Sequence, residues 1–220
     1  MINVNKSIYS LVLSDEVVEA VDALARTAGL SRSAMINRIL AERVAFVTPE
    51  MRLREVLESL ARSMNDAFML AEKPTGSTLS ARTSLKYRYK PTVKYSVEIY
   101  SENGKSAGEL RVSFRSQNAQ LIGDLTDFFK CWTALEQKYI ADKISGDILY
   151  TIQDGRFTRT LNMPRDEITE DELGAAVADY MAMLDGTMKE YFLKLPDERE
   201  AIRSAEELYR KTIAEQSVII

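Results

Sequence analysis

The stretch Ile8–Val44, IYSLVLSDEVVEAVDALARTAGLSRSAMINRILAERV, decides the fold of the first part of this chain. The run Ser7–Leu13 is strand-like. Directly after it, Ser14 offers an N-cap hydroxyl, and Asp15 and Glu16 put negative charge at the positive end of a helix dipole. We therefore expect a strand that leads straight into a helix.

Two short helices should follow that strand. Apolar residues at helical spacing mark one stripe on the first helix: Val17, Val18, Val21, Leu24, Ala25 and Ala28. Gly29 stands where a left-handed residue ends a helix, and Ser31 can cap the next one. The apolar positions of the second helix repeat at three and four: Met35, Ile36, Ile39, Leu40 and Val44. The predicted unit is strand, helix, tight turn and helix.

A unit of this size is incomplete as a single copy. One strand with two one-sided helices buries too little apolar surface, and the lone strand leaves its backbone edge unpaired. Two copies solve both problems by pairing their strands and interlocking their helices. We therefore expect a homodimer.

Residues 4 to 46 resemble the ribbon-helix-helix domain of the Arc, MetJ and CopG repressors, and the CopG type most closely. The resemblance lies in the LxLS motif before the first helix, the apolar stripe of that helix, and the turn GLSRSAMI at Gly29–Ile36. It implies an intertwined dimer whose two-stranded antiparallel ribbon enters the DNA major groove. Backbone amides at the start of the second helix would hold phosphates, which makes Ser31, Arg32 and Ser33 the expected phosphate contacts. The plainer alternatives are a helical hairpin behind an edge strand, and an Arg32 that is only a solvated charge.

The outward face of the ribbon departs from the family pattern. If Tyr9 and its alternate neighbours face the dimer core, the base-contacting positions are Lys6, Ile8, Ser10 and Val12. Family members usually carry polar side chains at the positions of the last three. Ile8 and Val12 can make only an apolar contact with a thymine methyl group. Ser10 is therefore the only one of these three residues that can form a direct hydrogen bond with a base. The alternative is a ribbon that packs on protein.

The first 47 residues carry five basic and five acidic side chains, so attraction to DNA needs help from elsewhere. Between Lys73 and Val97 the chain has six basic residues and no acid. We expect a second DNA contact at Arg82, Lys86, Arg88 and Lys90. Strand alternation would place the last three on one face, with tyrosines on the other. The alternative is a solvated strand edge protected by lysines and by Pro91.

The predicted fold class is α+β, with three parts. Residues 1–47 form the ribbon-helix-helix dimerisation and DNA-binding domain. Residues 48–84 form a helix that begins at Thr48-Pro49, followed by a linker at Pro74–Ser84. The helix is a stalk, a helix pair or a spacer, and its buried stripe should be Val56, Leu57, Leu60, Met64 and Phe68. Residues 85–220 form an α+β domain of two strand-strand-helix units, hence four strands, plus a C-terminal helix. The helix of the first unit should bury one face: Leu121, Leu125, Phe128, Trp132, Leu135 and Tyr139. The helix of the second unit should begin with a capping box at Thr169 to Glu172 and bury another such face: Leu173, Val177, Tyr180, Leu184, Met188 and Tyr191. We expect this last domain to serve oligomerisation or to bind a protein partner or a small effector, neither of which the sequence identifies.

The composition excludes several chemistries. Histidine is absent and Cys131 is the only cysteine, so His-dependent triads, zinc sites and internal disulfides are not expected. The chain has no Gly-rich phosphate loop, and its acids at Asp166–Glu172 suit a helix start. Cys131 is expected to be apolar filler within a helix. With no signal peptide and no apolar run of about 20 residues, we expect a cytoplasmic protein that is not an enzyme and uses no metal, cofactor or membrane.

These observations favour a dimeric, sequence-specific DNA-binding protein, most simply a transcriptional repressor. A plasmid or phage accessory protein for partition or DNA transfer uses the same module and stays open as an alternative. So does an assembly protein in which the module only dimerises. The expected partners are double-stranded DNA and a second copy, with higher oligomers left open.

Overall fold

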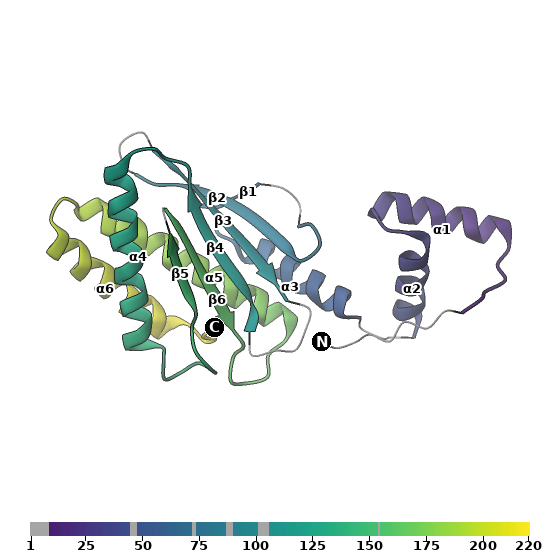
Figure 1. Ribbon diagram of the computed structural model, residues 1–220. Coiled ribbons are helices and arrows are strands. Elements are labelled where there is room, and N and C mark those ends of the chain that lie inside the picture. The colour runs from purple at the N-terminus through teal and green to yellow at the C-terminus, as the bar shows by residue number, and fades with distance from the viewer. Residues whose placement is uncertain (1–8, 45–47, 72–73, 87–89, 101–105, 154) are drawn as a thin grey trace. The chain divides into compact units, whose positions relative to one another are not determined.

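The computed structural model of this chain describes residues 9–44, 48–71, 74–86, 90–100, 106–153 and 155–220 (Figure 1). The chain divides into two compact units, Met1–Arg52 and Leu53–Ile220. The architecture mixes helices with one antiparallel sheet, as the sequence predicts.

The first unit contains the two predicted helices. They are α1 at Asp15–Ala28 and α2 at Arg32–Arg43. Their shared core is small, because it consists of Val21, Ala25 and Met35 with Ile36 packed against them.

The second unit is built on a sheet of six strands in the order β1-β2-β3-β4-β6-β5, every neighbouring pair antiparallel. The elements that follow α2 are, in chain order, α3 Pro49–Ser63, whose first turn precedes the boundary between the units, β1 Met69–Leu70, β2 Thr78–Ser84, β3 Thr92–Ile99, β4 Ser106–Phe114, α4 Ala119–Tyr139, β5 Tyr150–Gln153, β6 Arg156–Asn162, α5 Glu170–Lys194 and α6 Glu198–Glu215. The two predicted strand-strand-helix units are confirmed as β3-β4-α4 and β5-β6-α5, and the C-terminal helix is α6.

The predicted linker at Pro74–Ser84 is wrong for most of its length. Strand β2 occupies Thr78–Ser84 and pairs with the whole of β3, from Thr78 opposite Glu98 to Ser84 opposite Thr92. Leu79 and Ala81 point into the core with 1% and 0% exposure. The segment is rich in serine and threonine, which resembles linker composition, but every second side chain is small or apolar and fits the buried face of a sheet.

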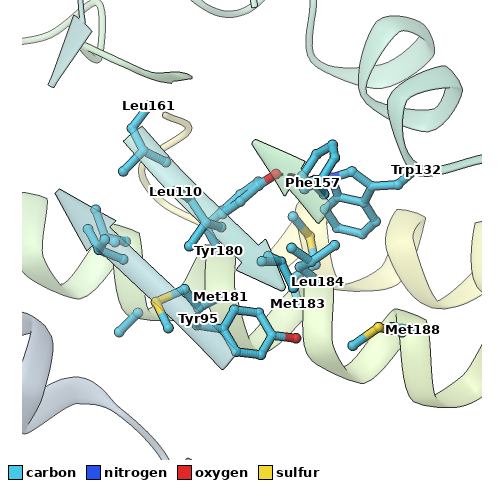
Figure 2. Close-up of a cluster of buried hydrophobic side chains, with 14 of the residues drawn as sticks. Tyr95, Leu110, Trp132, Phe157, Leu161, Tyr180, Met181, Met183, Leu184 and Met188 are labelled. Atoms are coloured by element: carbon cyan, nitrogen blue, oxygen red, sulfur yellow. Dashed lines mark hydrogen bonds between the residues drawn. The ribbon is translucent and has the colours of Figure 1, made fainter. Parts of the chain in front are cut away.

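The helices cover one face of this sheet, and the core lies between the two layers. Figure 2 shows Tyr95 and Leu110 from the strands beside Tyr180, Met181 and other side chains of α5. From α4, Phe129 stacks on Phe157 of β6 with the ring centroids 4.7 Å apart. The predicted inward stripe of α5 is confirmed, because all six of its positions are buried: Leu173, Val177, Tyr180, Leu184, Met188 and Tyr191.

Helix α3 is neither a stalk nor a spacer, which corrects another expectation. Its Leu57 and Leu60 have 1% and 0% exposure and belong to the main core. The Ser59 hydroxyl donates to the Asp171 carbonyl at 2.7 Å, which ties α3 to the start of α5. The apolar stripe of α3 therefore completes the second unit.

Candidate nucleic-acid interface

The turn between α1 and α2 has the geometry that the sequence predicts. Gly29 adopts φ 66° and ψ 27°, a left-handed conformation that residues with a Cβ rarely adopt. The next amide, that of Leu30, donates to the Ala25 carbonyl at 2.9 Å and closes the end of α1. This tight closure brings the start of α2 close to α1.

The first turn of α2 presents an anion-binding arrangement. The Ser31 hydroxyl accepts from the Ala34 amide at 3.2 Å and caps the helix, as predicted. Helix geometry leaves the amides of Arg32 and Ser33 without an acceptor inside the helix. These amides and the positive end of the helix dipole favour a phosphate oxygen at this position.

The Arg32 side chain is already engaged with Asp22 of α1. Its Nε donates to Asp22 Oδ1 at 2.7 Å and its Nη2 to Oδ2 at 2.6 Å, a bidentate pair. The hydrogen bond from Arg32 lowers the pKa of Asp22, and the same bond raises the pKa of Arg32. The guanidinium charge is therefore compensated within the chain. Local sequence patterns do not reveal this pair, because the two residues are ten positions apart and only the Gly29 turn brings them together.

The predicted ribbon strand does not appear in the described residues. Tyr9–Ser14 has no strand assignment, while Lys6 and Ile8 lie outside the described part of the chain. Of the expected base-contacting residues, Ser10 and Val12 are described, and both are exposed, Val12 completely. A ribbon strand requires a partner strand for its hydrogen bonds, and none of the residues that the structure describes pairs with this segment.

The first unit leaves much apolar surface in water. Tyr9 is 82% exposed and Leu11 58%, and several residues in the two helices or at their ends are exposed as well: Val17, Leu24, Leu30, Ile39, Leu40 and Val44. Single exposed apolar residues are normal on a protein surface, but this many on a unit with so small a core favour a protein partner.

The predicted second basic contact lies in the other unit. Arg82 is exposed on β2, directly opposite Lys94 of β3. Lys86 and Lys90 lie in the connection between these strands, and Arg88 is outside the described residues. Lys86 and Lys90 have no strand assignment, because β2 ends at Ser84 and β3 begins at Thr92, and the residues between these two lysines lie outside the described part of the chain.

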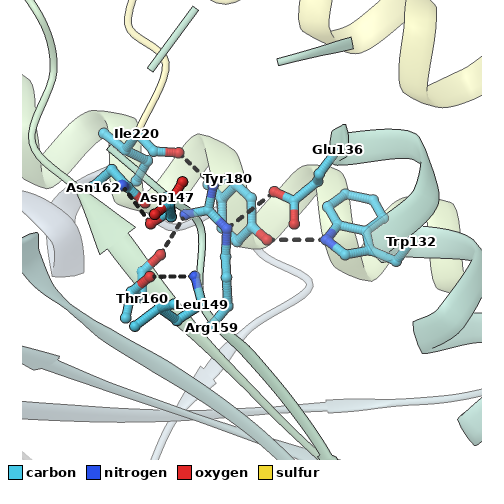
Figure 3. Close-up of polar contacts among 9 residues, drawn as sticks. All are labelled: Trp132, Glu136, Asp147, Leu149, Arg159, Thr160, Asn162, Tyr180 and Ile220. Atoms are coloured by element: carbon cyan, nitrogen blue, oxygen red, sulfur yellow. Dashed lines mark hydrogen bonds and ion pairs between the residues drawn. The ribbon is translucent and has the colours of Figure 1, made fainter. Parts of the chain in front are cut away.

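A buried polar cluster in the second unit was not predicted. Arg159 of β6 and Glu136 of α4 both have 0% exposure, and Arg159 Nε lies 3.0 Å from Glu136 Oε1 (Figure 3). Arg159 also donates to the main-chain oxygens of Thr160 at 3.0 Å and Ile220 at 2.6 Å. Burial raises the pKa of Glu136, and the adjacent guanidinium opposes that shift.

The surroundings of this pair are those of a packed core. The Arg159 guanidinium lies 4.5 Å from the centre of the Tyr180 ring, whose hydroxyl accepts from Trp132 Nε1 at 3.0 Å. Strand alternation could have revealed Arg159, since it falls between the inward positions Phe157 and Leu161. Enclosed among aromatic rings, the pair holds α4 to the sheet.

The remaining candidate groups have structural surroundings. Thr169 and Glu172 form the predicted capping box of α5, and the Thr169 amide lowers the pKa of Glu172. Cys131 is half-buried in α4, and burial raises the pKa of its thiol to about 11. Among the described residues, no helix is both long enough and apolar enough to span a membrane.

Comparison with known proteins adds one finding. Residues 10–45 match the family model of the ribbon-helix-helix proteins of the copG family. The match covers the segment before α1, α1 itself, the turn at Gly29 and α2. The N-terminal unit therefore carries a ribbon-helix-helix domain. Neither the curated proteins nor the solved structures contain a match to this chain.

Proposed function

We propose that this protein is a cytoplasmic, dimeric, sequence-specific DNA-binding protein, most simply a transcriptional repressor. The observation that carries the proposal is the ribbon-helix-helix match at residues 10–45, in a unit whose segment Tyr9–Ser14 is exposed and has no strand partner among the described residues. A second copy supplies that partner. The joined ribbon then has the width of a two-stranded element that fits the major groove.

Dimerisation is supported by the exposed apolar side chains of the first unit. Leu11 and Leu13 are 58% and 40% exposed, and Leu24 of α1 and Leu40 of α2 are each 53% exposed. Burying a fully exposed leucine contributes roughly 1.5–3 kcal/mol, so covering the exposed half of each of these side chains against a second copy contributes roughly 1 kcal/mol. The core of Val21, Ala25 and Met35 is too small to replace that contribution.

The proposed DNA contacts divide into two kinds. The amides of Arg32 and Ser33, with the capped start of α2, position a phosphate and carry no sequence information. Ser10, on the outward face of the ribbon, reads a base edge, and Val12 offers an apolar contact to a thymine methyl. Because Nε and Nη2 of Arg32 are held by Asp22, we assign Nη1 to the phosphate.

The test begins with the full chain and a pool of sheared DNA from its source, followed by sequencing of the retained fragments. An enriched short motif supports sequence-specific binding, and light scattering should give the mass of two copies at micromolar concentration. With the enriched site in hand, Arg32→Ala should weaken binding to all sequences and Ser10→Ala should reduce discrimination among them. Arg38→Ala is the matched control, since Arg38 lies on the same helix in an i,i+4 pair with Glu42. A single-copy mass together with no retained motif would refute the proposal.

Two other functions keep some support. A partition or DNA-transfer accessory protein would use the same contacts and would differ only in where its sites lie. An assembly protein is favoured by the complete exposure of apolar Val12 and by the compensation of Arg32 by Asp22. Salt dependence separates the classes, because DNA affinity must fall steeply between low and physiological salt when phosphates are neutralised.

A further inference from the structure

The face of the sheet opposite the helices is open to water. Along each strand, buried positions alternate with exposed or half-buried ones, and the latter share this face. On β2, for example, Arg82 and Ser84 are exposed while Ala81 and Thr83 are buried. The open face consists mostly of serine, threonine and charged side chains.

Strand register places three cations on one line across this face. Proceeding from one edge strand to the other, directly opposed residues make up the row: Met69, Arg82, Lys94, Ser113, Arg156 and Gln153. We call these six residues the basic row. The row contains no acid, and within the described residues none of its three cations forms an ion pair.

The acids of the open face lie further along the strands. Glu98 of β3 lies directly opposite Glu109 of β4, four residues along the strands from Lys94 and Ser113 of the basic row. Both acids are close to Arg111. Arg111 Nη2 lies 3.4 Å from Glu98 Oε2, so its charge is compensated. The positive charge of the face is therefore concentrated at the basic row and toward Lys86 and Lys90 beyond it.

We propose that the basic row binds the phosphate backbone of duplex DNA. The inference rests on the proposed function, which brings duplex DNA to this chain as its polyanionic partner. Neighbouring strands are about 4.8 Å apart, so Arg82 and Arg156, three strands apart, are separated by roughly 14 Å. One strand of the duplex carries a phosphate about every 3.4 Å of helix axis, so the row spans about four of them.

The composition of the face favours duplex DNA over other partners. Interfaces with proteins have an apolar, aromatic core, whereas Met69 at the edge is the only large apolar member of the row. Single-stranded nucleic acids require aromatic platforms for stacking, and the row contains no aromatic side chain. Interfaces with duplex DNA are polar and strongly basic, and Ser113 and the neighbouring Ser84 and Thr92 add hydroxyl donors for phosphate oxygens.

The test compares two triple variants of the full chain that lose the same charge. One changes the basic row, Arg82→Gln, Lys94→Gln and Arg156→Gln. The other changes exposed cations on the helical side, Lys130→Gln, Arg203→Gln and Lys211→Gln. Affinity for the enriched DNA site is measured over a range of salt concentrations, and circular dichroism checks that both variants fold.

The basic-row variant should bind at least about tenfold more weakly, and its slope of log affinity against log salt should fall by about 0.9 for each lost contact. In the helical-side variant, the change in log affinity and the change in salt slope should each be at most about half of the change seen in the basic-row variant. In the unchanged chain, Lys94 should be protected from acetylation when duplex DNA is added, while Lys130 should not. Equal losses in the two variants, or an unprotected Lys94, would overturn this inference and leave the proposed function standing. If the unchanged chain retains no DNA even at low salt, the proposed function fails and this inference fails with it.

Discussion

Gly174 of α5 should not tolerate any side chain, although it lies within a helix. A Cβ at this position would lie 2.5 Å from Ser59 Cβ, 2.6 Å from the Val56 carbonyl oxygen and 2.7 Å from the Leu60 amide nitrogen. The last two atoms are backbone of α3 and cannot rotate away. Gly174→Ala therefore forces α3 and α5 to separate by about 1 Å before ordinary contact distances of roughly 3.5 Å are restored.

The change in stability that Gly174→Ala should cause is the sum of two opposing contributions. Forcing one methyl into a packed contact costs about 1–3 kcal/mol, while replacing glycine by alanine within a helix stabilises by up to about 1 kcal/mol. We expect a net loss of about 1–2 kcal/mol in the free energy of unfolding of the second unit. For a unit of this size, that loss lowers Tm by about 2–8 °C.

The chain offers both a probe and a matched control for this measurement. Trp132 is the only tryptophan and is fully buried in the second unit, so its fluorescence during thermal or urea unfolding reports on that unit. Gly186 lies in the same helix with no atom within 4 Å of the Cβ it would gain, so Gly186→Ala should leave stability unchanged or raise it. Adding Ser59→Gly to Gly174→Ala should not restore stability, because the two backbone contacts remain. Equal stability of the two alanine variants would refute the close contact between α3 and α5.

Three further predictions concern single groups. Because burial raises the pKa of Cys131 to about 11, its alkylation by iodoacetamide should accelerate about tenfold per pH unit up to about pH 10; a plateau near pH 8.5 would contradict this. The same shift means that the thiol favours the folded state below its unfolded pKa of about 8.5, and that this contribution declines as pH rises toward 11. Glu136→Leu should lower stability in urea unfolding by about 3–5 kcal/mol by leaving Arg159 unpaired, whereas Glu136→Leu with Arg159→Met should recover most of the loss; equal losses would show that the pair is not coupled. Asp22→Asn should raise DNA affinity by freeing the Arg32 guanidinium for phosphate, and a fall in affinity would instead show that the pair is needed to orient α2.

Local signals in the sequence were sufficient for the helices and for most of the sheet. The cap at Ser31, the left-handed Gly29 and the capping box of Thr169 each depend on residues within a few positions of one another, and all three are confirmed. Periodicity likewise identified the buried faces of α4 and α5, because a helix that covers a sheet must present one apolar stripe.

Composition was misleading where packing decided the outcome. The segment Thr78–Ser84 resembles a linker, but hydrogen bonds along all of β3 hold it in the sheet. The stripe of α3 was recognised, but a stripe does not identify the surface that covers it. That surface includes Gly174, more than a hundred residues further along the chain.

Pairs distant in sequence were beyond local patterns. The Asp22–Arg32 pair depends on the angle of a turn, and the Glu136–Arg159 pair on the register of β6 against α4. The basic row is a similar case. Arg82 and Lys94 belong to the basic segment between Lys73 and Val97, but Arg156 joins them only because strand pairing places it in the same row.

The charges of the two units suggest how affinity and specificity are divided between them. The N-terminal 47 residues are electrically neutral, and the cation at the start of α2 is compensated by Asp22. Such a domain can select a sequence through Ser10 and the ribbon, but it gains little from neutralising phosphates. The basic row has the opposite character, because its three cations lack acidic partners among the described residues and the row includes no group placed to read a base. Changes in the ribbon should therefore alter which site is bound at a given salt concentration. Changes in the basic row should alter how tightly every site is bound and how steeply that affinity declines as salt is added.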